Sequence, residues 1–301
     1  MPENFKIGNF KTSSFKISSF KKYLLPMLLI FLFTGCTVRL IYNHLDWIIP
    51  WYVSDYIDLN DDQDNLLDKK LFAQLKWHRV TQLTSYSKFL RQLKVNFNNG
   101  LKYEDLDRCH NQMRKFWQDL IMHAVPDIAK ILSTASDEQI EEFLENLEKR
   151  NEKYKERYID LTEEELRKKK VARMNRFLDF CMGDVNKEQE ELVDNWSKKL
   201  KNISVVRFDF IKKSQKRLKK ILRNRKDEET FSEDLTEFFF FRRRNWPPDL
   251  RDIAAHNRDL TKKTFIEIVN HMSSDQREYL NEQIDDLAEV FDELAAEKID
   301  E

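Results

Sequence analysis

Side chains with oxygen atoms at alternate positions can bind a metal ion, and one such segment occurs in this sequence of 301 residues. The segment DLNDDQD at 58–64 begins as a calcium-binding loop would. Such a loop needs glycine at its sixth position and a bidentate glutamate at its twelfth, where this chain has Gln63 and Lys69. We therefore interpret the acids as the first turn of a helix, where the helix dipole favours negative charge.

Motifs for nucleophilic or metal-dependent catalysis give no stronger candidate. The six histidines form no HExxH, the three cysteines form no CxxC, and no GxSxG, SxxK or Walker loop occurs. Glu267 and His271 stand four residues apart, but one such pair is weak evidence for a metal site. The sequence predicts a protein that is not an enzyme and has no metal or cofactor. A hydrolase or metal-dependent enzyme with an unrecognised carboxylate site is the alternative.

A basic segment at 210–226, FIKKSQKRLKKILRNRK, is the third candidate. It contains nine basic residues and no acid, and apolar residues recur on one side of the predicted helix. Such a helix can bind the phosphates of anionic lipid or an acidic partner protein. The alternative is a solvated face whose charge is balanced by acids at 227–229 and elsewhere. The candidate interaction residues are Lys212, Lys213, Lys216, Arg217, Lys219 and Lys220.

The N-terminal segment has the composition of a secretory leader. Five lysines precede the apolar stretch YLLPMLLIFLF at 23–33, and Thr34 and Gly35 then lead to Cys36. A basic region, an apolar stretch of about ten residues and small residues at its end are typical of a cleaved signal peptide, and the stretch is too short for a spanning helix. An uncleaved signal anchor followed by an ordinary cysteine is the alternative.

The tetrapeptide FTGC at 33–36 resembles the lipobox of bacterial lipoproteins. The resemblance implies removal of residues 1–35 as a signal peptide, a diacylglycerol thioether on Cys36, and an acyl chain such as palmitate on its new N-terminus. Thr37, rather than Asp, follows the cysteine, which in Gram-negative lipoproteins implies sorting to the outer membrane. We therefore expect a lipoprotein of the outer membrane that faces the periplasm, with these covalent lipids and no other cofactor.

An aromatic segment, DWIIPWYVSDYIDL at 46–59, follows this cysteine closely. Two lipid chains already anchor a protein stably, so the aromatic residues have no need to supply membrane affinity. We predict that Trp47, Trp51 and Tyr56 pack residues 36–59 onto the body of the protein and fix its orientation relative to the lipid. The alternative is that the tryptophans lie at the lipid–water interface.

The composition indicates an all-α fold that positions these segments. Only four glycines occur, which leaves few tight turns, whereas Leu, Lys, Glu and Gln favour helices. Residues 1–35 hold five basic side chains and one acid, so the rest of the chain has 47 basic and 52 acidic side chains. A chain of this mild acidity is not a general nucleic-acid binder.

Five capping boxes predict helix starts. In each box the side chain of Asn, Ser or Thr accepts from the third helical N–H, and Gln or Glu three residues later reaches back to the cap. The uneven spacing of the boxes is unlike a solenoid of equal repeats. The pairs are Asn60 and Gln63, Ser136 and Gln139, Thr162 and Glu165, Asn186 and Gln189, and Ser273 and Gln276.

Apolar residues at helical spacing follow these starts, and Gly100, Pro126, Gly183 and the prolines of NWPPD at 245–249 mark expected helix ends. We predict an elongated bundle of about eight to ten helices after the signal peptide. Because no linker divides the chain, we expect a lipid-anchored joint segment at 36–59 and one helical domain at 60–301.

Cys109 and Cys181 lie in predicted helices on apolar stretches. In an oxidising compartment they can form a disulfide, but buried free thiols are the alternative, because spacing along the chain does not fix their geometry.

The block LDWIIPWYVSDYIDL, the helix start NDDQ and the string WHR at 77–79 resemble an uncharacterised family of Gram-negative lipoproteins, a domain of unknown function. The resemblance extends to about residue 294 and brings no established activity. The helix starts LNDDQ and LTEEE are also similar to the LTxxQ of small periplasmic chaperones. We expect a non-catalytic binding, scaffold or chaperone-like role in the cell envelope, with envelope proteins or anionic lipid as partners; an envelope enzyme is the alternative.

Overall fold

The computed structural model describes residues 35–240 and 244–297, and over this part of the chain every regular element is helical. The all-α prediction is confirmed. The elements are α2 (Gly35–Tyr42), α3 (Leu45–Val53), α4 (Asp61–His78), the π-helical turn η2 (Arg79–Leu83), α5 (Thr84–Asn98), α6 (Tyr103–Ser133), α7 (Asp137–Tyr158), α8 (Glu163–Met182), α9 (Lys187–Lys199), α10 (Ser204–Arg223), α11 (Glu228–Phe240), α12 (Pro248–Asn270) and α13 (Ser274–Ala296).

Because α4, η2 and α5 continue into one another, the described residues form eleven helices. This number is one more than the upper bound of the prediction, since the joint segment itself folds as the two short helices α2 and α3. All five predicted capping boxes are present. The predicted ends at Gly100 and Gly183 also hold, as both glycines adopt positive φ angles, of 84° and 77°.

Pro126 does not end a helix, so that prediction is wrong. It lies in the interior of α6. Its neighbours Val125 and Ala129 are 0% and 3% exposed and belong to a core cluster that also contains residues of α11. This packing stabilises the continuous helix against the loss of one backbone hydrogen bond at proline.

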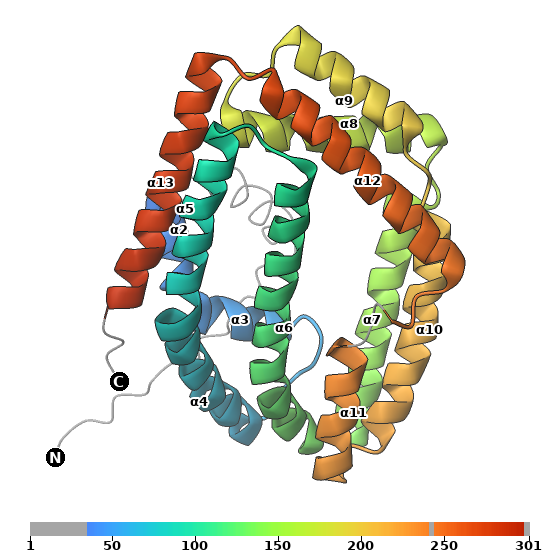
Figure 1. Ribbon diagram of the computed structural model, residues 1–301. Coiled ribbons are helices and arrows are strands. Elements are labelled where there is room, and N and C mark those ends of the chain that lie inside the picture. Colours follow the sequence, from blue (N-terminus) through green and yellow to red (C-terminus); the bar gives the residue numbers. More distant parts are fainter. Residues whose placement is uncertain (1–34, 241–243, 298–301) are drawn as a thin grey trace, which may run out of the picture.

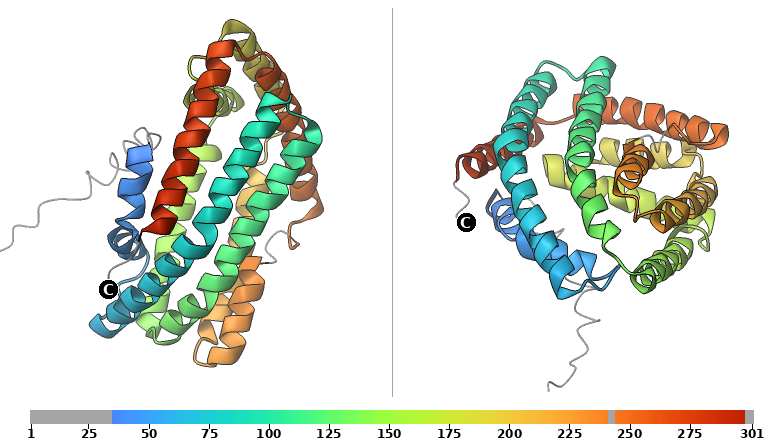
Figure 2. Two further views of the ribbon diagram at one scale, coloured as in Figure 1. Left: turned by 60° about the vertical axis from the view of Figure 1, so that its left-hand side comes forward. Right: turned by 90° about the horizontal axis from the view of Figure 1, so that it is seen from below.

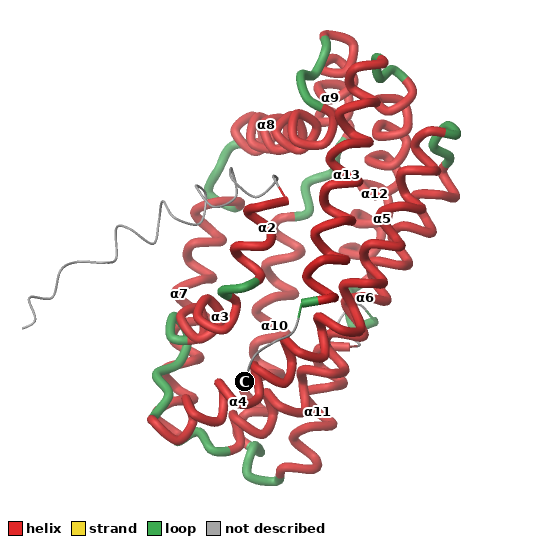
Figure 3. The backbone as a smooth tube through the Cα atoms, turned by 90° about the vertical axis from the view of Figure 1, so that its left-hand side faces the viewer, coloured by secondary structure: helices red, strands yellow, loops and turns green. Residues whose placement is uncertain are grey.

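Helices α5, α6 and α13 lie side by side along the long axis of the molecule (Figure 2), whereas α12 crosses it obliquely (Figure 1). Figure 1 shows α13 along α5, α6 near α11, and α8 and α9 at the upper end. Helices α2 and α3 form an outer layer on one side of this arrangement (Figure 3). Helix α10 lies on the other side, next to α7 and α11 (Figure 1).

Three separate hydrophobic clusters form the core. One lies at the lower end in the view of Figure 1, where α6, α7, α10 and α11 meet, and includes Phe231 and Leu222, both 0% exposed. A second lies at the upper end around Leu178 and Ile268, and a smaller third one joins α2, η2 and α13 around Leu294. The third cluster contains Tyr42, so α2 is part of the packed body rather than a free tether.

Four of the five capping boxes meet in pairs through their glutamines. Gln189 and Gln276 exchange reciprocal amide hydrogen bonds of 3.0 and 2.9 Å, and Gln276 Nε2 also donates to the carbonyl of Asp184. Gln63 and Gln139 form the same pair at 3.1 and 2.7 Å. We call these two arrangements the glutamine joints.

The two glutamine joints are built from similar sequences. The first joint begins with DLNDDQDNLLD at 58–68 and the second with DVNKEQEELVD at 184–194. In each, the second glutamine donates to the carbonyl of the residue two before the Asn cap, Asp58 in one and Asp184 in the other. The same helix junction therefore occurs twice in the fold, although the chain is not a solenoid.

Candidate functional site

Helix α3 is apolar along most of its length and yet lies at the surface. Its sequence is LDWIIPWYV, and none of its residues is buried. Trp47 is 62% exposed, and its ring stacks on that of Trp51 with centroids 6.3 Å apart. The prediction that Trp47 packs onto the body is wrong, because the core contacts of this helix are made by its two ends, Leu45 and Val53. A contiguous exposed apolar surface of this kind marks an interaction site.

Tyr56, in contrast, does pack onto the body. Its ring lies 6.2 Å from that of Phe143 of α7, and the guanidinium of Arg150 lies 3.9 Å from its centroid. Burial raises the pKa of Tyr56 far above its usual value. The backbone carbonyl of Tyr56 accepts a hydrogen bond from Asn146 at 2.9 Å, so this residue fixes the chain where it enters α4.

A polar cluster holds α2 against the body. The Nδ1 atom of His78 lies 2.9 Å from the hydroxyl of Tyr42, and its Nε2 lies 3.3 Å from the hydroxyl of Tyr86. Burial raises the pKa of Tyr42 to about 12 and lowers that of His78. The half-buried imidazole of His78 lies between two hydroxyls and joins α2, α4 and α5, and both of its nitrogens have partners within the protein.

Arg79, the next residue, extends this cluster to α13. It is 9% exposed and donates to Glu297 at 3.0 Å and to Asn43 at 2.9 Å. Arg39 of α2 also pairs with Glu297 and with Glu293 of α13. Residues 78 and 79 lie where α4 passes into the π-turn, a local distortion that is frequent at functional sites. The string WHR was the only sequence signal for this cluster.

Protonation of His78 is expected to weaken the attachment of α2. Its pKa is lowered in the folded state by burial, so the unfolded chain binds more protons as the pH falls through its ordinary value of 6.5. The His78 contribution to stability is therefore present at pH 7.5 and is lost as the pH falls below about 6.5 toward the folded pKa. We expect the melting temperature to decrease between pH 7.5 and 5.5, and by less in a His78→Asn variant. Equal pH dependence in the two proteins would contradict this role.

The basic residues of α10 are only partly neutralised. Lys212 pairs with Asp209 at 3.5 Å, Arg217 with Glu237 at 2.8 Å, and Lys219 with Glu141 at 3.0 Å. These acids come from α7, α10 and α11. Over the described residues, three more candidates have no acidic partner: Lys213, Lys216 and Lys220. The face therefore retains an excess of positive charge.

The remaining sequence candidates do not form a site. Cys109 of α6 and Cys181 of α8 are free thiols, and burial raises the pKa of Cys181 to about 12. The ring of His271 bonds to the backbone carbonyl of Glu267 at 2.7 Å. Within residues 35–240 and 244–297 no group of three or more metal-ligating side chains occurs. Over the same residues, no helix has both the length and the apolar character needed to cross a membrane.

The fold and the candidate site thus define an all-α helical protein with two candidate interaction surfaces, the apolar helix α3 and the basic face of α10. The model of a family of unknown function, DUF6279, matches residues 55–251, and the chain belongs to this family. An uncharacterised family was expected, and this expectation is confirmed. The matched range includes η2 and α10 but begins after α3. No curated protein and no solved structure matches the chain.

Proposed function

We propose that this protein is a lipoprotein of the bacterial cell envelope, anchored in the outer membrane through a diacylglycerol and an acyl chain on Cys36, and facing the periplasm. Its role there is non-catalytic: it binds or scaffolds other envelope components. The leader before Cys36 supports the anchor, and the surface position of α3 supports the orientation.

The exposed ring of Trp47, which stacks on the half-buried Trp51, is the observation that carries this proposal. Trp47 lies eleven residues after Cys36, and Trp47 and Tyr52 are the large apolar side chains that α3 exposes, whereas Leu45 and Val53 pack against core clusters. Leu40 of the preceding helix is also 59% exposed. Tryptophan is favoured at the boundary between lipid and water, where its ring is buried among headgroups. We infer that α3 lies on the membrane surface while α2 connects it rigidly to the body.

The anchor is tested by labelling cells with radioactive palmitate and separating their inner and outer membranes. The wild-type chain is expected to carry label and to fractionate with the outer membrane. A Cys36→Ser variant is expected to carry none and to leave the outer-membrane fraction. An unlabelled wild-type protein, or one in the inner membrane, would contradict the proposal.

A Trp47→Ala/Trp51→Ala double variant is expected to alter the contact with lipid much more than stability. Because Trp47 is mostly exposed and no residue of α3 is buried, the loss in unfolding free energy should be below about 1 kcal/mol. In bilayers of brominated lipid, fluorescence quenching of the wild type should be largely lost in this variant.

Trp117→Ala is the matched control for that measurement. Trp117 is 60% exposed, as Trp47 is, but lies on α6. Its removal should leave the quenched fraction unchanged. If Trp117→Ala abolishes quenching and the α3 variant does not, α3 is not the membrane-facing surface.

The binding role is tested by crosslinking in cells followed by identification of the crosslinked proteins and lipids. Recovery of defined envelope components, reduced when α10 lysines are replaced, is expected. An envelope enzyme is favoured instead if no crosslinked component is recovered and the protein shows a catalytic turnover that is lost when one buried acid is replaced.

A further inference from the structure

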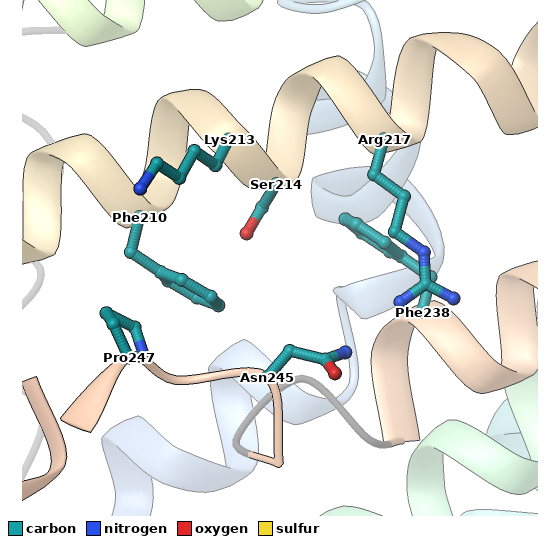
Figure 4. A pocket seen from close by; sticks show the side chains of 7 residues that line it. All are labelled: Phe210, Lys213, Ser214, Arg217, Phe238, Asn245 and Pro247. Carbon is teal, nitrogen blue, oxygen red and sulfur yellow. The ribbon is translucent and has the colours of Figure 1, made fainter.

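A cavity of about 250 Å³ lies between α10, α11 and residues 245–247. Figure 4 shows the side chains around it: Ser214 points into the space between the rings of Phe210 and Phe238, and Arg217 extends along the far side toward Phe238. The lining residues are Phe210, Lys213, Ser214, Arg217, Phe238, Asn245 and Pro247. Two of them, Lys213 and Arg217, belong to the basic face of α10.

The polar groups of this cavity have unused hydrogen-bonding capacity. Among the described residues, Lys213 has no acidic partner, and the side chains of Ser214 and Asn245 make no hydrogen bond. Arg217 donates through one Nη atom to Glu237, which leaves further N–H groups free. Ammonium, guanidinium, hydroxyl and amide groups together can donate to a phosphate or carboxylate.

The walls of the cavity are apolar. Phe210 and Phe238 are each 8% exposed, so their rings form a fixed surface rather than mobile side chains. Pro247 closes one end (Figure 4). A ligand that uses the whole cavity therefore needs an anionic group for α10 and an apolar group for the rings. An inorganic anion alone would leave the rings uncovered.

We propose that this cavity binds an anionic amphiphile, with its phosphate or carboxylate group at Ser214, Arg217 and Asn245 and its apolar group against Phe210 and Phe238, while Lys213 adds positive charge at the Phe210 end (Figure 4). The ligand is a membrane lipid or a free ester of the same chemistry. This site is separate from the α3 surface, since none of its lining residues belongs to α2 or α3. The inference therefore does not rest on the proposed anchor and can fail or succeed independently of it.

Hexyl phosphate, inorganic phosphate and hexanol are the probes, titrated by calorimetry into the full chain in the presence of nanodiscs of neutral phosphatidylcholine. Hexyl phosphate is expected to bind at least about 10-fold more tightly than either of the other two. In a Lys213→Ala/Arg217→Ala variant its affinity should fall about 10-fold or more, since one charge-assisted contact and one further positive charge of the cavity lining are lost. Phe238→Ala should weaken hexyl phosphate but not inorganic phosphate.

A Lys212→Ala/Lys216→Ala variant is the matched control. It removes the same charge from the same helix but leaves the cavity lining intact, so its affinity should stay within about 2-fold of wild type. Melting curves of all variants check that they fold.

Nanodiscs that contain phosphatidylglycerol test the source of the ligand. Weaker hexyl phosphate binding in their presence identifies the membrane as the source, and unchanged binding identifies a free ester. Absence of wild-type binding, equal binding of inorganic phosphate, or equal losses in the two double variants would overturn the site.

Discussion

Replacing Gln189 with glutamate is expected to lower the free energy of unfolding by about 3 kcal/mol at pH 7. Gln189 is 0% exposed, and its Nε2 donates to Gln276 Oε1 at 3.0 Å. A carboxylate accepts hydrogen bonds but donates none, so the variant buries a charge and places two acceptor oxygens opposite each other. The capping box itself is retained, because glutamate serves equally well at that position of a helix.

Glu165→Gln is the matched control for this variant. Glu165 completes the capping box of α8, where its carboxylate accepts a hydrogen bond from the backbone N–H of Thr162 at 2.8 Å. Among the described residues it makes no hydrogen bond to another capping box. The exchange at this exposed position should change stability by less than about 0.5 kcal/mol. Urea denaturation followed by circular dichroism measures both variants.

A second measurement on Gln189→Glu uses pH. Burial raises the pKa of the new carboxyl in the folded state, and a protonated carboxyl can again donate one hydrogen bond. The deficit relative to wild type should therefore shrink as the pH falls from 7 toward about 5. A constant deficit, or an equal loss in Glu165→Gln, would show that the glutamine joint does not hold these helices together.

The glutamine joints show which features of the fold the sequence predicts and which it does not. All five helix starts follow from the capping pattern, because a capping box is a local contact between residues three apart. The pairing of boxes joins residues 87 apart in one joint and 76 apart in the other, and no local rule specifies it. One sequence signal does distinguish them: the four paired boxes end in Gln, and the unpaired box ends in Glu165. At pH 7 an amide both donates and accepts across such a joint, whereas a carboxylate only accepts.

The candidate surfaces were predicted less completely. The basic residues of α10 were recognisable by charge alone, but the cavity was not, since Phe238 and Asn245 come from other segments. The prediction for Trp47 failed because it followed from the sufficiency of two lipid chains for anchoring, which does not specify where the ring of Trp47 packs. The cluster of His78 and Arg79 depends on partners in α2 and α13, which only the tertiary fold brings together.

Arg225→Ala is expected to cost about 3 kcal/mol of unfolding free energy. Arg225 is 3% exposed and lies just after α10. Its Nε donates to the carbonyl of Ala135 at 3.0 Å and its Nη1 to that of Leu222 at 3.2 Å, while the remaining nitrogen pairs with Asp137. Alanine removes the guanidinium from both carbonyls, so that Ala135 keeps only the ammonium of Lys226 at 3.1 Å and Leu222 keeps only backbone N–H donors, and it opens a cavity beside the core cluster that contains Ala135 and Leu222.

Arg223→Ala is the control, because Arg223 is exposed in the last turn of the same helix and should contribute less than about 0.5 kcal/mol. Arg225→Lys should recover little of the lost stability, since a single ammonium cannot reach three acceptors that a guanidinium contacts at once.

The guanidinium also holds the pKa of Asp137 below its usual value, so carbon-13 NMR titration of that carboxyl should show a rise of its pKa toward the ordinary value in Arg225→Ala. If stability falls but the titration of Asp137 is unchanged, the loss comes from the cavity alone and the bonded junction between α6, α7 and α10 is not what Arg225 maintains.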